Sequence, residues 1–289
     1  MSMESLAELE AACKDQDIFD VILNSDCVER GVTREESFEK MREVYNAIRR
    51  AAGRYNPALR SASGMVGGDG AKMRAYVAAG NTLCGDYIGQ VITQALEMGE
   101  NNACMKCIVA APTAGSCGVL PAVLLPYQQR EELDDDAMVR ALYVAGAIGQ
   151  VIASKASIAG AAGGCQAEIG TASAMAASAL CYLCGGDAQT ICHAAAIALK
   201  SLMGLVCDPI AGLVEVPCVK RNASGALIAM CSADMALAGI RSAVPPDEVI
   251  MAMRDVGDKM DVSLRETGTG GVAGTPFGTK IAEEMGVEL

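Results

Sequence analysis

The chain has 289 residues, which is enough for one large domain or two small ones. Apolar residues make up 52% of it, but aromatic residues make up only 3% and tryptophan is absent, so we expect a core of small aliphatic side chains and methionine in closely packed helices. The net charge of −12 argues against a nucleic-acid-binding protein and against binding to an anionic membrane surface, because both need basic patches.

The first 60 residues are more highly charged than the rest, and we expect them to form peripheral helices of the same unit as a helical domain at 61–289. The acidic N-terminus does not resemble a signal peptide. Capping boxes are predicted at Ser5 with Glu8 and at Thr33 with Glu36. After the second box, one helical face carries Phe38, Met41, Val44, Tyr45 and Ile48.

Helix patterns dominate the remainder of the chain. Residues 71–98 are predicted to be helical, and helices are predicted to begin at the aspartates of 134–136 and at the Pro-Pro-Asp of 245–247. The only alternating segment, 214–218, is short and is interrupted by Pro217. The sequence therefore predicts an all-α fold, with no internal repeat.

Two long stretches lack charged residues, at 107–129 and 169–186. The second has 18 residues, which is the lower limit for a membrane-spanning helix. Because it is rich in alanine, serine, threonine and glycine, we interpret it as a buried core helix instead.

Four loops combine glycines with hydroxyl side chains, at 61–69, 112–118, 157–164 and 267–271. Glycine permits close backbone approach, and a loop of this kind before a helix directs several N–H groups at one point, which suits a carboxylate or phosphate. Taken singly, each loop is a weak signal, and a plain connection between helices is the favoured interpretation. Four of them beside candidate metal ligands favour a common pocket.

Thirteen cysteines without a signal peptide indicate a reducing compartment, with thiols free or bound to metal. Three of them lie in separate short motifs, GGCQAE around Cys165, VCDP around Cys207 and VPCVKRN around Cys218. Three thiolates are one short of an ordinary four-cysteine iron–sulfur site. A cubane cluster held by these three would keep one iron open as a Lewis acid.

These motifs resemble those of the iron–sulfur-dependent L-serine dehydratases (L-serine ammonia-lyases), and in particular the α subunit of the two-subunit form. The resemblance runs from about residue 60 to 276. It is carried by IVAAPTAGSCGVLPAV at 108–123, ASIAGAAGGCQAE at 156–168 and CDPIAGLVEVPCVKRN at 207–222, and less closely by RETGTGGVAGTP at 265–276.

The resemblance implies a helical iron–sulfur catalytic domain at 61–289 with a [4Fe–4S] cluster on Cys165, Cys207 and Cys218. It also implies cytoplasmic conversion of L-serine to pyruvate and ammonia, in serine catabolism and gluconeogenesis. Single-chain relatives carry an additional N-terminal α/β region that this chain lacks, so a β subunit is implied as partner, with homo-oligomerisation left open. Some relatives have a cysteine near the C-terminus at the fourth iron position; residues 283–289 have none, so we expect water or another ligand there.

The base that removes the substrate α-proton cannot be named from the sequence, and it could come from the partner chain. The candidates near the motifs are Lys155, Glu168, Glu215 and Glu266. His193, the only histidine, lies in an apolar helical stretch and is expected to be a packing residue. Arg221 is expected to orient the cluster loop or the substrate, or to form an ion pair. The expected substrate contacts are Ser63, Gly64, Thr113, Ala114, Gly115, Ser116, Ser157 and Asn222.

Three alternatives remain at this point. Two CxxC pairs, at 104–107 and 181–184, are typical of a zinc site or a thiol-redox protein, although cysteines three apart on a helix often only pack. A pyridoxal-phosphate enzyme with Lys155 as Schiff base would need an α/β fold, which the pattern opposes. A non-enzymatic helical scaffold with buried cysteines is the third.

Overall fold

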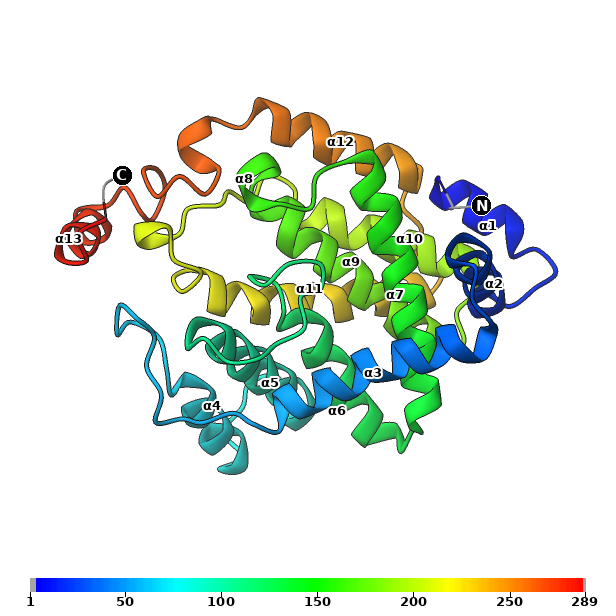
Figure 1. Ribbon diagram of the computed structural model, residues 1–289, viewed down its shortest axis with the longest axis horizontal. Helices are drawn as coiled ribbons and strands as arrows, with labels where there is room; N and C mark the ends of the chain where they lie inside the picture. The colour runs from blue at the N-terminus through cyan, green and yellow to red at the C-terminus, as the bar shows by residue number, and fades with distance from the viewer. Residues whose placement is uncertain (1–3, 288–289) are drawn as a thin grey trace.

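A single buried helix, α9 (Cys165–Leu183), runs through the centre of the computed structural model, which describes residues 4–287 (Figure 1). It packs against α6 (Val119–Glu131), α7 (Asp135–Lys155), α10 (Ala188–Ser201) and α11 (Cys218–Leu237). Residues 4–287 contain no β-strand, and the prediction of an all-α fold is confirmed.

The composition of α9 explains how it can be enclosed by other helices. Sixteen of its 19 residues are buried, and most are alanine, serine, threonine or glycine. Small side chains let neighbouring helices approach closely: a Cβ placed on Gly225 of α11 would lie 2.8 Å from Ile169. The hydroxyl of Ser173 donates to the carbonyls of Ile169, at 2.8 Å, and Gly225, at 2.9 Å, so its burial leaves no unpaired donor. The interpretation of 169–186 as a core helix is confirmed.

Three N-terminal helices, α1 (Leu6–Ala12), α2 (Ile18–Arg30) and α3 (Arg34–Ala52), cover this bundle. Helix α1 packs on α10, whereas α2 and α3 pack on α7. Their apolar side chains belong to the same hydrophobic core as those of α7, α9 and α10. The chain before residue 60 therefore contributes to the core that supports the rest.

The two predicted capping boxes differ in the structure. Thr33 and Glu36 form a complete box at the start of α3. At α1, Ser5 accepts a hydrogen bond from the N–H of Glu8, but the Glu8 carboxylate accepts from the N–H of Glu4. The predicted apolar face of α3 is buried or packs against the core, at Phe38, Met41, Val44, Tyr45 and Ile48.

The segment 71–98 is not one continuous helix. The structure has α4 (Asp69–Ala78) and α5 (Gly85–Ala103), and α4 packs back against α5. Gly80 and Gly85 adopt φ values of 70° and 75° in the turn between them. A left-handed backbone ends a helix and costs glycine little, which explains the break.

Helix α12 (Pro246–Lys259) begins at the predicted Pro-Pro-Asp, and Asp134 caps α7 as expected. The remaining elements are the single turn α8 (Gly160–Gly163), two 3₁₀ turns and the C-terminal α13; the last three span Ile210–Gly212, Val262–Leu264 and Pro276–Glu284. Helix α7 is long and apolar enough to span a membrane, but 67% of its most apolar window is buried inside the protein, as in a core helix.

Candidate metal centre

Two of the three motif cysteines occupy the first residue of a long helix. Cys165 begins α9 and Cys218 begins α11, whereas Cys207 lies in the loop between α10 and α11. A helix N-terminus carries partial positive charge and unpaired N–H groups, which favour a thiolate over a thiol. Of the two helix-start cysteines only Cys165 has a lowered pKa, because burial and neighbouring negative charges raise the pKa of Cys218.

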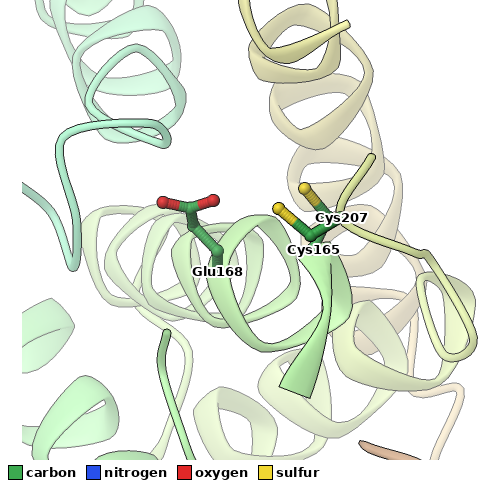
Figure 2. Close-up of side chains that lie close together, drawn as sticks. All are labelled: Cys165, Glu168 and Cys207. Atoms are coloured by element: carbon green, nitrogen blue, oxygen red, sulfur yellow. The ribbon is translucent and has the colours of Figure 1, made fainter. Parts of the chain in front are cut away.

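The sulfur atoms of Cys165 and Cys207 and a carboxylate oxygen of Glu168 all lie within 4.8 Å of one another. Figure 2 shows both sulfurs and the carboxylate on the same side of α9, because Cys165 and Glu168 are three residues apart on that helix. Both cysteines are buried and Glu168 is partly buried. Within residues 4–287, no other group of three metal-ligating side chains comes this close together.

The ionisable side chains at this centre change one another's pKa values. The pKa of Cys165 is lowered, first by the hydrogen bond from the Cys207 thiol and then by the Arg221 guanidinium, whose Nη1 lies 3.5 Å from the sulfur. The same hydrogen bond and burial raise the pKa of Cys207. Burial, followed by the negative charges of Cys165 and Glu168, raises the pKa of Cys218. Cys218 therefore lies close enough to these two groups to feel their charge.

The donor set fits an iron–sulfur cluster. Three buried thiols suit a soft metal centre. Cys218 does not lie within 4.8 Å of all the other three donor atoms, so the three sulfurs are spread more widely than the compact group of Cys165, Glu168 and Cys207. Space beside Cys207 is kept by Gly160 in α8, where a Cβ would lie 2.8 Å from the sulfur.

The loop at 112–118 is tied to this centre from two sides. The Thr113 hydroxyl donates to the Glu168 carboxylate, and the same carboxylate lies so close to Gly115 that a Cβ there would be 2.7 Å from it. Asn222 donates to the carbonyls of Gly115, at 2.8 Å, and Cys218, at 3.0 Å, and accepts the N–H of Gly118 at 2.8 Å. The Asn222 amide therefore joins the loop to α11.

The same loop contains two more expected substrate contacts. The Ser116 side chain is buried and donates to the carbonyl of Ala111 at 3.3 Å, whereas Ala114 is exposed.

The loop at 61–69 is anchored beside Cys218. The hydroxyls of Ser61 and Ser63 both donate to the buried carboxylate of Glu215, the first at 2.6 Å. Gly64 turns the loop with a φ of 76°. Glu215 thus holds a loop, and both of its oxygens face that loop rather than the metal-ligand group.

The loop at 267–271 is held by Asp208, which follows Cys207. One Asp208 oxygen accepts the N–H of Val272 at 2.7 Å and the other pairs with Arg221 at 2.8 Å. The N–H of Glu266 donates to the Cys207 carbonyl at 2.7 Å. A Cβ on Gly160 would lie 3.2 Å from the Glu266 carboxylate as well as beside the Cys207 sulfur, so these two groups are neighbours.

Similarity to known proteins identifies the family of this chain. The family model described as "Serine dehydratase alpha chain" matches residues 6–273. The chain belongs to this family. A Bacillus subtilis (strain 168) protein named "probable L-serine dehydratase, alpha chain" is 46% identical over 93% of this chain and 89% of its own length. The L-serine dehydratase alpha chain of Peptoniphilus asaccharolyticus is 42% identical over 93% and 92%.

Longer members of the group match less of their own length. The L-serine dehydratase TdcG of Escherichia coli (strain K12) is 44% identical over 62% of this chain, and this match covers 40% of the longer protein.

Three residues singled out in the sequence do not belong to the compact group of Cys165, Glu168 and Cys207. Lys155 ends α7, 3.9 Å from Asp247, and the Ser157 hydroxyl accepts the N–H of Ala159 at 3.0 Å. His193 lies on α10 and accepts the N–H of Ser242 at 3.1 Å. Asp208 was missed by sequence reasoning, although its place directly after Cys207 could have indicated a supporting role.

The CxxC pairs form no comparable ligand group within the described residues. Cys181 is buried and its thiol donates to the Ala233 carbonyl at 3.7 Å, while Cys184 is exposed. Cys104 is partly buried at the end of α5 and Cys107 is exposed.

Proposed function

We propose that this protein is an L-serine ammonia-lyase, which dehydrates and deaminates L-serine to pyruvate and ammonia. The observation that carries the proposal is the meeting of Cys165, Cys207 and Glu168 within 4.8 Å in a chain that belongs to the serine dehydratase alpha chain family. Two relatives cited above are named as L-serine dehydratase alpha chains, one of them as a probable one. The match covers 89% and 92% of their lengths.

We also propose that Cys165, Cys207 and Cys218 hold a [4Fe–4S] cluster. When bound, such a cluster supplies a Lewis acid for the departure of the substrate hydroxyl. Arg221 would offset the negative charge of the thiolates, because its guanidinium lies 3.5 Å from the Cys165 sulfur and is oriented by Asp208 at 2.8 Å.

Glu168 is the proposed general base. Its carboxylate lies within 4.8 Å of the Cys165 and Cys207 sulfurs, and the Thr113 hydroxyl donates to it and orients it. Burial, and then the nearby charge of Glu266, raise its pKa, which suits a carboxylate that takes up a proton near neutral pH. Transfer of the α-proton to Glu168, and departure of the hydroxyl as water once the Glu168 carboxyl has returned that proton to it, would leave 2-aminoacrylate and an ionised Glu168. The imine tautomer of 2-aminoacrylate hydrolyses to pyruvate and ammonia.

The proposed setting is cytoplasmic, with a β subunit as partner. The support is that longer single-chain relatives have about 60% of their length outside the matched region, because the match covers 40% of them. The matching relatives of similar length are named as alpha chains.

The test of the base is Glu168→Gln in protein reconstituted anaerobically with iron and sulfide, with and without a β partner, with Glu248→Gln on exposed α12 as the control. We expect pyruvate release from L-serine to fall by roughly 10² to 10⁴-fold in Glu168→Gln, at unchanged iron content, because general-base catalysis contributes this much. The control should match the wild type. Release at the wild-type rate by Glu168→Gln would remove this residue from the mechanism. If the wild type releases no pyruvate from L-serine, with or without the β partner, the proposed activity is wrong. A parallel assay with L-threonine measures the preference between the two substrates.

A further inference from the structure

A second polar site adjoins α8, and its lining contains none of the three motif cysteines. It is a cavity of about 360 Å³ between the end of α7, the turn α8, the start of α9 and the last turns of α12. Figure 1 shows α8 between α12 and α9. The side chains of Lys155, Ser157, Arg254 and Asp258 contribute charge or hydroxyl groups to its lining, and Gly163 and Ala167 leave it open.

Neither cation of the cavity has a close carboxylate partner. Lys155 Nζ lies 3.9 Å from Asp247, whose oxygens already accept the N–H groups of Leu6 and Ala7 at 3.0 and 2.9 Å. The Nε of Arg254 lies 3.9 Å from Asp258, and the Nη1 of Arg254 donates to the backbone carbonyl of Lys155 at 3.5 Å. The two carboxylate separations are too long for hydrogen bonds, so Lys155 Nζ and the Nε and Nη2 of Arg254 have donors available for an anion.

The hydroxyl of Ser157 adds a third donor. Its oxygen accepts the N–H of Ala159 at 3.0 Å, which leaves its own hydrogen able to point elsewhere. The cavity thus brings together two positive charges, the hydroxyls of Ser154 and Ser157 and one negative charge in a chain whose net charge is −12. This local excess of positive charge runs against the charge of the whole molecule.

We propose that this cavity binds a small oxyanion, a carboxylate or a phosphate, through Lys155, Arg254 and Ser157. The lining of the site contains neither the motif cysteines nor Glu168, and the proposal does not depend on the reaction proposed above. A bound anion would bridge α7 and α12 beside α8. Because Gly160, the first residue of α8, adjoins the Cys207 sulfur and the Glu266 carboxylate, such an anion would hold in place the turn that forms one wall of the centre.

The first test is calorimetric titration of the anaerobically prepared full chain with phosphate, acetate and pyruvate, each against chloride at equal ionic strength. We expect saturable binding of one anion per chain for at least one of the three. The comparison of their affinities shows whether the site prefers a carboxylate or a phosphate. Arg254→Gln should weaken binding by about tenfold or more, because a hydrogen bond to a charged group is lost. Lys259→Gln, on the same helix but paired with Asp255 outside the cavity lining, should leave affinity unchanged.

A second pair of variants tests for an increase in anion affinity. Asp258→Asn removes the negative charge from the lining and should tighten binding several-fold, while Asp255→Asn on the same helix should not. Absence of saturable binding by the wild type would overturn the proposal, as would equal effects of Arg254→Gln and Lys259→Gln, which would indicate general charge attraction only.

Hydrogen exchange locates the site independently of affinity. Saturating anion should slow amide exchange in residues 157–164 of the wild type, and the slowing should vanish in Arg254→Gln. Circular dichroism of that variant checks that it is folded. Binding without any protection of 157–164 would place the anion elsewhere and contradict the assignment.

Discussion

At the scale of the residue, the centre depends on side chains that join segments far apart in the sequence. Asn222 is the clearest case, because its amide makes hydrogen bonds to Gly115, Gly118 and Cys218 from a position that is 1% exposed. The sequence singled it out as an expected substrate contact. Its structural partners could not be predicted, because a motif does not reveal which distant backbone groups its side chains will meet.

Replacing Asn222 by alanine should lower the free energy of unfolding by about 1–3 kcal/mol, because the buried N–H of Gly118 and the carbonyl of Gly115 lose their partner. Ser224→Ala, at an exposed position of the same helix, should stay within about 0.5 kcal/mol of the wild type. Urea unfolding under anaerobic conditions measures both. Equal stability of the two variants would mean that these hydrogen bonds contribute nothing net.

The only histidine makes a second residue-scale prediction. Burial, and then the positive charge of Arg241, lower the pKa of His193 in the folded protein. As the pH falls through the ordinary histidine pKa near 6.5, the unfolded chain takes up a proton that the folded chain does not, so stability falls. His193→Asn keeps an acceptor for the N–H of Ser242 and should lose less stability than the wild type between pH 7.5 and 5.5. An equal or larger loss in the variant would contradict this account.

At the scale of the element, helix starts were predictable where a polar cap precedes an apolar stripe. Thr33 and Asp134 cap α3 and α7, and α12 begins at Pro246, all as expected. The break between α4 and α5 was not predicted, since glycines within a helical pattern do not reveal on their own that the backbone turns back.

Thr33→Ala removes the acceptor for the N–H of Glu36 and should cost about 1 kcal/mol of unfolding free energy. Thr33→Ser retains the hydroxyl and should cost much less. A difference in urea midpoint between these two variants measures the cap alone. If Thr33→Ala and Thr33→Ser have the same midpoint, the capping box does not stabilise α3.

At the scale of the whole molecule, composition predicted the helical fold better than it predicted the arrangement of the site. A chain poor in aromatic residues and rich in alanine can enclose α9 on several sides, and this was foreseeable. Which loops meet was not, because the hydrogen bonds from Ser61 to Glu215 and from Thr113 to Glu168 join positions 154 and 55 residues apart. Such contacts follow from how the helices pack.

The same limit applies to the cysteines. The motifs singled out three thiols among thirteen, and the fold buries all three, with Cys165 and Cys207 beside Glu168. The sequence placed Glu168 in the motif of Cys165 as one of four candidate bases, but it did not indicate that the Cys207 sulfur would join this pair. The site therefore offers two alternative modes of metal binding. One is a cluster on the three cysteines, and the other is a single ion on Cys165, Glu168 and Cys207.

Iron and acid-labile sulfide per chain, measured after anaerobic purification, decide between them. We predict about four iron and four sulfide in the wild type, as for a [4Fe–4S] cluster, with the same content in Glu168→Gln and in the control Cys181→Ser, whose thiol is buried at the other end of α9. Cys218→Ser should lose both. A single metal ion without sulfide, retained in Cys218→Ser and lost in Glu168→Gln, would contradict the cluster.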